Sequence, residues 1–194
     1  MNLADALTAS RLVMAPVFFV VYMWSGSFGL PPSASVVILL TLFVLIEVSD
    51  LLDGMAARAQ KTVSSFGKLF DPFADVFARL TYFVCFSFTG IMPLWIFLII
   101  MYREFCQLFL RQLLAEKGVT MGARKGGKTK AVFYMIAGAA SLVLWSVNSL
   151  GVLIAYQDLL STTVFVLYCV AAILSVGSFL DYIIQFRKIT AQKR

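Results

Sequence analysis

The chain has 194 residues, of which 61% are hydrophobic and only 13% are charged. Soluble domains are about 45–50% apolar and about 25% charged, so this composition excludes a soluble globular protein and predicts an all-α integral membrane protein. The net charge of +6 does not indicate nucleic-acid binding, because the charges stand in short segments between apolar runs, as in loops that face the cytoplasm and anionic membrane lipids. The sequence has no histidine, and its three cysteines have the spacing of neither a disulfide framework nor a zinc site.

The N-terminal part of the chain predicts three helices. Residues 2–11 favour a short amphipathic helix on the membrane surface, without signal-peptide features, and a first span continues from Leu12 to Trp24. A second span is expected from about Ser35 to about Ala59, and the final turns of that span are polar on one side. After a connector at 60–66, a third helix is expected over 67–88, with its polar residues in the first half.

Three further helices are expected in the C-terminal part. They cover about 92–116, 128–146 and 160–186, and a glycine-rich basic loop precedes the second of them. The alternate connections on one side of this topology contain no Lys or Arg, whereas the other side holds most of the positive charges. Because cytoplasmic loops are enriched in Lys and Arg, the pattern predicts six transmembrane helices in the cytoplasmic (inner) membrane, with both termini in the cytoplasm.

Four aspartates, at 50, 53, 71 and 75, stand in the last turns of the second span and the first turns of the third helix. A carboxylate at the centre of a membrane helix costs about 2.5–3.5 kcal/mol on an insertion scale, so four together require a role. Asp50 and Asp53 are three residues apart and Asp71 and Asp75 four apart, so each pair shares one helix face. The short connector makes the two helices antiparallel neighbours, which places both pairs at similar depth near the cytoplasm.

Carboxylate oxygens at this density favour hard cations, Mg²⁺ or Mn²⁺, and four carboxylates are enough for two ions. A structural ion-pair network or an ion pathway is the alternative role for acids in a membrane. Gly54 and Ala57 leave their helix face open to a ligand, and Arg58 is placed to pair with a phosphate or a carboxylate. Gly67 begins the next helix and permits tight packing there.

The full spacing is D-x2-D-G-x2-A-R-x8-G-x3-D-x3-D, and every specified position is filled. This pattern resembles the signature of the CDP-alcohol phosphatidyltransferase family. The resemblance implies one membrane domain over residues 1–194, a homodimer, and transfer of a phosphatidyl group from CDP-diacylglycerol to an alcohol with release of CMP. It also implies roles for the motif residues. Under this resemblance, the metal ligands are Asp50, Asp53, Asp71 and Asp75, and Asp75 is also the general base. The residues that shape the CDP site are Gly54, Ala57, Arg58 and Gly67.

The choice of alcohol depends on residues outside this motif. Leu7, Thr8, Arg11 and Pro16 resemble the opening segment of bacterial phosphatidylglycerophosphate synthases, as do the Arg103-Glu104 pair and the segment around Lys128. The residues expected to bind the acceptor phosphate are Arg103, Arg111, Lys128 and Lys130, a basic set that suits glycerol 3-phosphate. Other acceptors remain open, namely phosphatidylglycerol, which would give cardiolipin, or serine. A cation transporter is the alternative from another class, although a transporter typically spreads its acids along a path through repeated halves.

For two charged residues, Arg79 and Glu104, a structural role is an alternative to a role in binding a ligand. Arg79 stands four residues after Asp75, so it either forms a salt bridge with that carboxylate or contacts a substrate. Glu104 is expected to orient Arg103 or Lys128.

Overall fold

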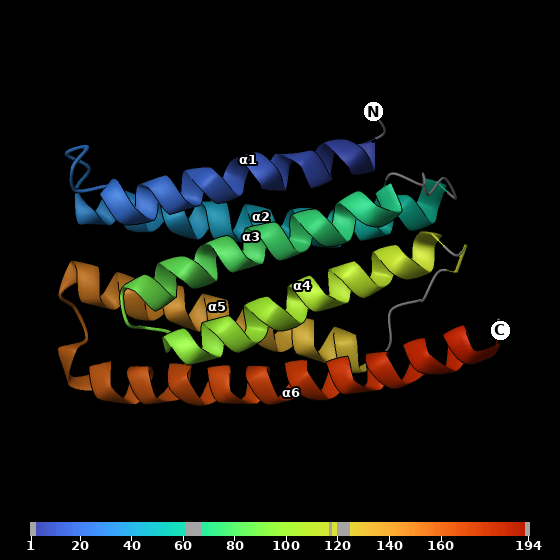
Figure 1. Cartoon of the computed structure of the whole chain (residues 1–194). Helices are drawn as coiled ribbons and strands as arrows, with labels where there is room; N and C mark the ends of the chain where they lie inside the picture. Colours follow the sequence, from blue (N-terminus) through green and yellow to red (C-terminus); the bar gives the residue numbers. More distant parts are fainter. Residues whose placement is uncertain (1–2, 61–66, 117, 120–124, 193–194) are drawn as a thin grey trace.

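The computed structural model describes residues 3–60, 67–116, 118–119 and 125–192, and within them all regular structure is helical. The elements are α1 (Leu3–Trp24), α2 (Pro32–Gln60), α3 (Gly67–Phe88), α4 (Leu94–Glu116), α5 (Lys125–Leu150), the short 3₁₀ helix η1 (Ile154–Tyr156) and α6 (Gln157–Gln192). Figure 1 shows the six long helices side by side in one bundle, with α1, α2 and α3 grouped together. This group meets the other three helices, α4, α5 and α6, where α3 packs against α4 and α2 packs against α5.

The six-helix architecture confirms the sequence prediction, and α3 has the expected bounds. Four helices contain stretches that are long and apolar enough to cross a membrane, at Ala6–Trp24, Pro32–Asp50, Gly126–Leu150 and Ile154–Ala191. Helices α3 and α4 do not meet this criterion because each carries several charged residues, most of which line the cavity described below. Both nevertheless lie along the other helices over their whole length (Figure 1).

The N-terminal segment differs from its predicted form. Residues 3–11 are not a separate surface helix but form the first turns of α1, which continues without a break to Trp24. The reason is Arg11, which is fully buried and makes ion pairs inside the bundle, so the start of α1 packs against its neighbours instead of lying in the membrane surface.

The last two helices are longer than predicted. Helix α5 begins at Lys125, so Lys128 and Lys130 lie within it and not at its edge. Helix α6 has 36 residues and runs through the segment expected to be a tail, as far as Gln192. At 1.5 Å per residue it is about 54 Å long, well beyond a hydrocarbon core of about 30 Å, so α6 extends outside the apolar layer.

An aromatic core joins the two halves of the bundle. The ring of Phe83 on α3 packs edge-on against Tyr134 of α5 and Tyr168 of α6, with both centroid distances at 5.6 Å. Gly138 allows α5 to approach this core, because a Cβ there would lie 3.1 Å from Phe43 and 3.2 Å from Tyr82. Large apolar side chains on the outer faces, such as Val37 and Ile173, are 63% and 71% exposed, as expected for surfaces that meet lipid.

Candidate functional site

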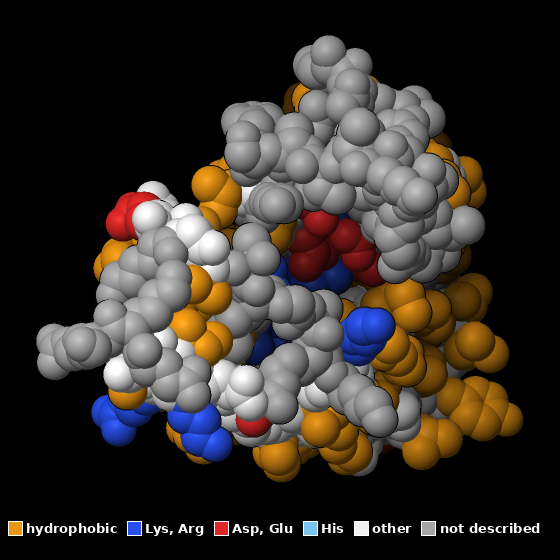
Figure 2. All heavy atoms as spheres, turned by 90° about the vertical axis from the view of Figure 1, so that its right-hand side faces the viewer, with side chains coloured by type: hydrophobic (Ala, Val, Ile, Leu, Met, Phe, Trp, Pro, Cys, Tyr) orange, Lys and Arg blue, Asp and Glu red, His pale blue; other side chains and the backbone are white. Residues whose placement is uncertain are grey.

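A cavity of about 250 Å³ opens at the end of the bundle where α1 begins and α6 ends. Figure 2 looks onto this end and shows acidic and basic side chains meeting in a hollow. Helices α2 to α6 all contribute to its lining. The acidic residues of the lining are Asp50, Asp71, Asp75, Glu104 and Asp181, and the basic ones are Arg79, Arg103, Arg111, Lys128 and Lys130.

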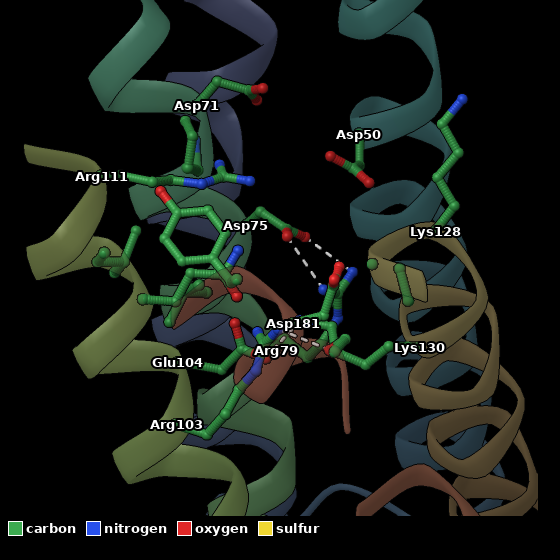
Figure 3. Close-up of a pocket in the computed structure, with 18 residues that line it drawn as sticks. Asp50, Asp71, Asp75, Arg79, Arg103, Glu104, Arg111, Lys128, Lys130 and Asp181 are labelled. Carbon is green, nitrogen blue, oxygen red and sulfur yellow. Dashed lines mark hydrogen bonds and ion pairs between the residues drawn. The ribbon is translucent and has the colours of Figure 1, made fainter. Parts of the chain in front are cut away.

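Asp50 from α2 and Asp71 and Asp75 from α3 form one side of this cavity, termed here the carboxylate wall. The sequence predicted that they would lie together, because short-connected antiparallel helices bring the end of one beside the start of the next. Their side chains are between 29% and 47% exposed, so a ligand in the cavity can reach them. Figure 3 shows the Asp75 carboxylate directed toward the space below Asp50.

Arg11 of α1 binds two members of the carboxylate wall. Its Nη1 donates to Asp50 Oδ1 at 2.7 Å and its Nη2 donates to Asp71 Oδ1 at 2.6 Å. One planar guanidinium therefore ties three helices together at the site, a geometry that a lysine with its single nitrogen cannot reproduce. Sequence reasoning did not assign Arg11 to the site, although its place in the L-T-x-x-R-x4-P segment was a signal.

Arg79 forms a two-point ion pair with Asp75. Arg79 Nη1 donates to Asp75 Oδ2 at 3.0 Å, and Nη2 lies 2.8 Å from Oδ1. The guanidinium is buried, also lies over the ring of Tyr134, and lines the cavity. The structure thus shows the salt-bridge alternative for Arg79, and the contact fixes the orientation of the Asp75 carboxylate.

The donor chemistry of the carboxylate wall suits a hard divalent cation, because a carboxylate offers several lone pairs and one arginine contact leaves further acceptor capacity. Among the described residues, however, no three acidic or cysteine side chains converge closely enough to hold a metal as they stand. Arg11 pairs with both Asp50 and Asp71, and the side chain of the fourth predicted ligand, Asp53, lies outside the described residues. The donor types therefore fit a cation, and Arg11, with one positive charge against two carboxylates, does not by itself balance their charge.

Arg103 and Arg111 from α4 and Lys128 and Lys130 from α5 form the basic wall of the same cavity. The four residues predicted to bind the acceptor phosphate thus lie together. Glu104 is buried among them and accepts hydrogen bonds from Arg103 Nη1, at 2.9 Å, and from Lys130 Nζ.

The lysine partner of Glu104 is Lys130 and not Lys128, which corrects one of the two predicted alternatives. Lys128 and Lys130 are two residues apart on one helix, so their side chains are related by a rotation of about 200° around the helix axis. Lys130 extends toward Glu104, whereas Lys128 is exposed and extends the other way (Figure 3).

Arg103 also joins α4 to α6. Its Nε donates to the Ser175 backbone oxygen at 3.2 Å and its Nη2 to Ser178 Oγ at 2.9 Å. With the bond to Glu104, three of its nitrogens are committed to the protein. Arg103 therefore fixes the packing of these helices at the site and has less capacity to bind a ligand than the sequence suggested.

The other predicted residues stand as follows. Gly67 is the first residue of α3, as expected. Asp53, Gly54, Ala57 and Arg58 fall in the last turns of α2, but their side chains lie outside the described residues. Residues of the lining that sequence reasoning missed include Gln107, Ser178, Asp181 and Tyr182, from α4 and α6. No local spacing indicates them, because α6 is about as far along the chain from the motif as it can be.

Comparisons with known proteins identify the family of the chain. A sequence model of the CDP-alcohol phosphatidyltransferase family matches residues 1–173. The chain is 37% identical over 193 residues to a CDP-diacylglycerol–glycerol-3-phosphate 3-phosphatidyltransferase of Treponema pallidum, covering 96% of this chain and 89% of that protein. It is 31% identical to a protein of the same name from Bacillus subtilis (73% of this chain, 77% of that one). A probable phosphatidylglycerophosphate synthase of Mycobacterium tuberculosis is 33% identical, with 70% of this chain and 63% of that protein covered.

A family match over most of the chain, together with four helices that are long and apolar enough to cross a membrane, settles the class of the protein. The chain is a multi-pass membrane enzyme of phospholipid synthesis that belongs to the CDP-alcohol phosphatidyltransferase family.

Proposed function

We propose that this enzyme transfers the phosphatidyl group of CDP-diacylglycerol to glycerol 3-phosphate, giving phosphatidylglycerophosphate and CMP. The observation that supports this choice best is that the carboxylate wall and the basic wall line one cavity. Acids suit a cation that binds a pyrophosphate, and bases suit an anionic acceptor. Relatives that carry this activity in their names support the same acceptor.

Asp50, Asp53, Asp71 and Asp75 are the residues proposed to hold Mg²⁺ or Mn²⁺, as two ions. When bound, such ions neutralise the pyrophosphate and improve CMP as a leaving group. On the protein side, Arg11 holds Asp50 and Asp71 in place, since its guanidinium pairs with both.

Asp75 is proposed to be the general base. Arg79 contacts both oxygens of its carboxylate, which fixes the direction in which the carboxylate points. A hydroxyl of the acceptor donates its proton to Asp75 as its oxygen bonds to the phosphorus that carries diacylglycerol, and the bond from that phosphorus to CMP breaks.

The substrates are assigned to the two walls. Gly54, Ala57, Arg58 and Gly67 are proposed to shape the CDP site, because they surround the aspartates in the motif. Arg111 and Lys128 are proposed to contact the acceptor phosphate, while Arg103 and Lys130, already bonded to Glu104, add positive potential around it.

We place the cavity and both termini on the cytoplasmic side of the inner membrane. Supporting this, α1 begins and α6 ends at the cavity end of the bundle (Figure 1), the same side on which the sequence concentrates Lys and Arg. Water-soluble CMP and glycerol 3-phosphate then exchange with the cytoplasm, and the diacylglycerol chains stay in lipid. A homodimer is part of the proposal and is supported by the family resemblance.

The test is CMP release from CDP-diacylglycerol by the purified protein, with glycerol 3-phosphate, phosphatidylglycerol or serine as acceptor. We expect release with glycerol 3-phosphate, its loss on chelation with EDTA, and its recovery on addition of Mg²⁺ or Mn²⁺. CMP release with serine or phosphatidylglycerol but not with glycerol 3-phosphate would contradict the proposed acceptor. Full activity in the presence of EDTA would contradict the proposed dependence on a divalent metal ion.

A further inference from the structure

Three buried polar atoms on the α4–α6 side of the cavity have no hydrogen-bond partner among the described residues. They are Gln107 Oε1 and Arg111 Nε on α4, and the Tyr182 hydroxyl on α6. All three residues line the cavity, and none belongs to the family motif or to the carboxylate wall. A buried polar atom without a partner costs about 1–3 kcal/mol, so three in one place indicate that something else meets them.

Tyr182 is the clearest of the three. The residue is 7% exposed, and a buried tyrosine hydroxyl ordinarily has a hydrogen-bond partner. The buried tyrosines Tyr134 and Tyr168 follow this rule, since their hydroxyls bond Ser175 and Ser141. The Arg111 side chain lies close to the Tyr182 hydroxyl, but the contact lacks the geometry of a full hydrogen bond, so the hydroxyl keeps its bonding capacity for a ligand.

The packing of α4 on α6 brings the three side chains together. Arg103, Gln107 and Arg111 are spaced four residues apart and so form one row along α4. Ser175, Ser178 and Tyr182 form the matching row on α6. Because Arg103 bonds to both serines, the next turns of the two rows, with Gln107 and Arg111 on one and Tyr182 on the other, also face each other.

The kinds of atom in this group identify the ligand chemistry. Gln107 Oε1 only accepts hydrogen bonds, Arg111 Nε only donates them, and a tyrosine hydroxyl does both. An ionised phosphate only accepts, so it cannot satisfy Gln107 Oε1. An alcohol hydroxyl donates one bond and accepts others, so it can satisfy this mixed set.

We propose that Gln107, Arg111 and Tyr182 form a subsite for the non-reacting hydroxyl of a polyol-phosphate acceptor. The inference rests on the proposed function, under which one hydroxyl of glycerol 3-phosphate reacts and the C2 hydroxyl does not. The subsite makes the enzyme select a polyol phosphate over an acceptor of the same length and charge that lacks this hydroxyl, because the buried atoms then stay unpaired.

The test compares kcat/KM for glycerol 3-phosphate and for 3-hydroxypropyl phosphate, which lacks only the C2 hydroxyl. The wild-type enzyme is expected to prefer glycerol 3-phosphate by about tenfold, the value of one hydrogen bond. Tyr182→Phe keeps the ring and removes the hydroxyl. It is expected to lower kcat/KM about tenfold for glycerol 3-phosphate and to leave the value for 3-hydroxypropyl phosphate unchanged.

The matched control is Tyr168→Phe, the same substitution on the same helix. The Tyr168 hydroxyl pairs with Ser141 Oγ at 2.7 Å and does not line the cavity, so this variant should keep the wild-type preference. Gln107→Met, which keeps a side chain of similar length, should weaken the preference as Tyr182→Phe does. It also provides the measurement if Tyr182→Phe does not fold.

Two results separate this inference from the proposed function. An equal loss of activity toward both acceptors, or an unchanged preference in Tyr182→Phe and Gln107→Met, would overturn the hydroxyl subsite while glycerol 3-phosphate remained the acceptor. Absence of CMP release by the wild-type enzyme with glycerol 3-phosphate would overturn the acceptor assignment itself, and the subsite with it.

Discussion

The carboxylate wall and the basic wall line one cavity but are built in different ways. The carboxylate wall comes from two consecutive helices, and its members are partly exposed. Its counter-charges, Arg11 and Arg79, are buried behind it. The basic wall comes from α4 and α5 and is braced by α6, and it carries its own counter-charge in the buried Glu104.

This difference indicates that the two walls have different roles. On the carboxylate wall, the buried arginines hold partly exposed oxygens toward the cavity, where a ligand can use them. On the basic wall, Glu104 occupies Arg103 and Lys130, so much of that charge maintains the packing of three helices. Substitutions on the first wall should act mainly on turnover, and substitutions at the centre of the second mainly on stability.

The largest effect is expected for Asp75→Asn. If Asp75 is the general base, removing its charge should lower kcat by about a thousandfold, within the range for general-base catalysis. CMP release is the measurement, and elution as a folded species in detergent checks the fold. Asp158→Asn, an exposed aspartate in the first turn of α6, is the matched control and should retain full activity. Appreciable turnover by Asp75→Asn would show that Asp75 is not the general base, and it would weaken the contrast drawn between the carboxylate wall and the basic wall.

The next effect is expected for Glu104→Gln. This change leaves Arg103 and Lys130 as buried cations without their carboxylate, which should cost about 3 kcal/mol of the free energy of unfolding. The thermal midpoint should fall by about 6–12 °C, as measured by a thermal-shift assay in detergent. Adding Lys130→Met should recover part of the loss, since it removes one unpaired cation. If stability is unchanged and only KM for the acceptor rises, Glu104 acts on the ligand and not on the packing.

The smallest effect is expected for Arg11→Lys. The charge is kept, but one nitrogen cannot bond both Asp50 and Asp71 at their observed positions, so one of two charge-assisted bonds is lost. We expect an activity loss of about tenfold, the equivalent of about 1.4 kcal/mol. Steady-state CMP release measures this loss, and Lys188→Arg, an exposed position on α6, serves as the control. Unchanged activity would show that the carboxylates hold their geometry without Arg11.

Much of the carboxylate wall could be predicted from the chain. Helical periodicity places Asp71 and Asp75 on one face, and a short connector places Asp50 nearby, so local rules were sufficient. The same rules gave the order of the helices and the bounds of α3. They failed for residues 3–11, where a buried ion pair between distant helices overrode the pattern of a surface helix.

The sequence by itself determined the membrane class, the six helices and the family, because composition, periodicity and a fixed motif are local properties of the chain. Only the tertiary structure decided which charges meet. Arg11 reaches Asp50 across 39 positions and Asp71 across 60, and Arg103 reaches Ser178 across 75. The placement of Tyr182 beside Arg111 was decided in the same way. Such pairings depend on how helices pack against one another, and no spacing within a single helix encodes them.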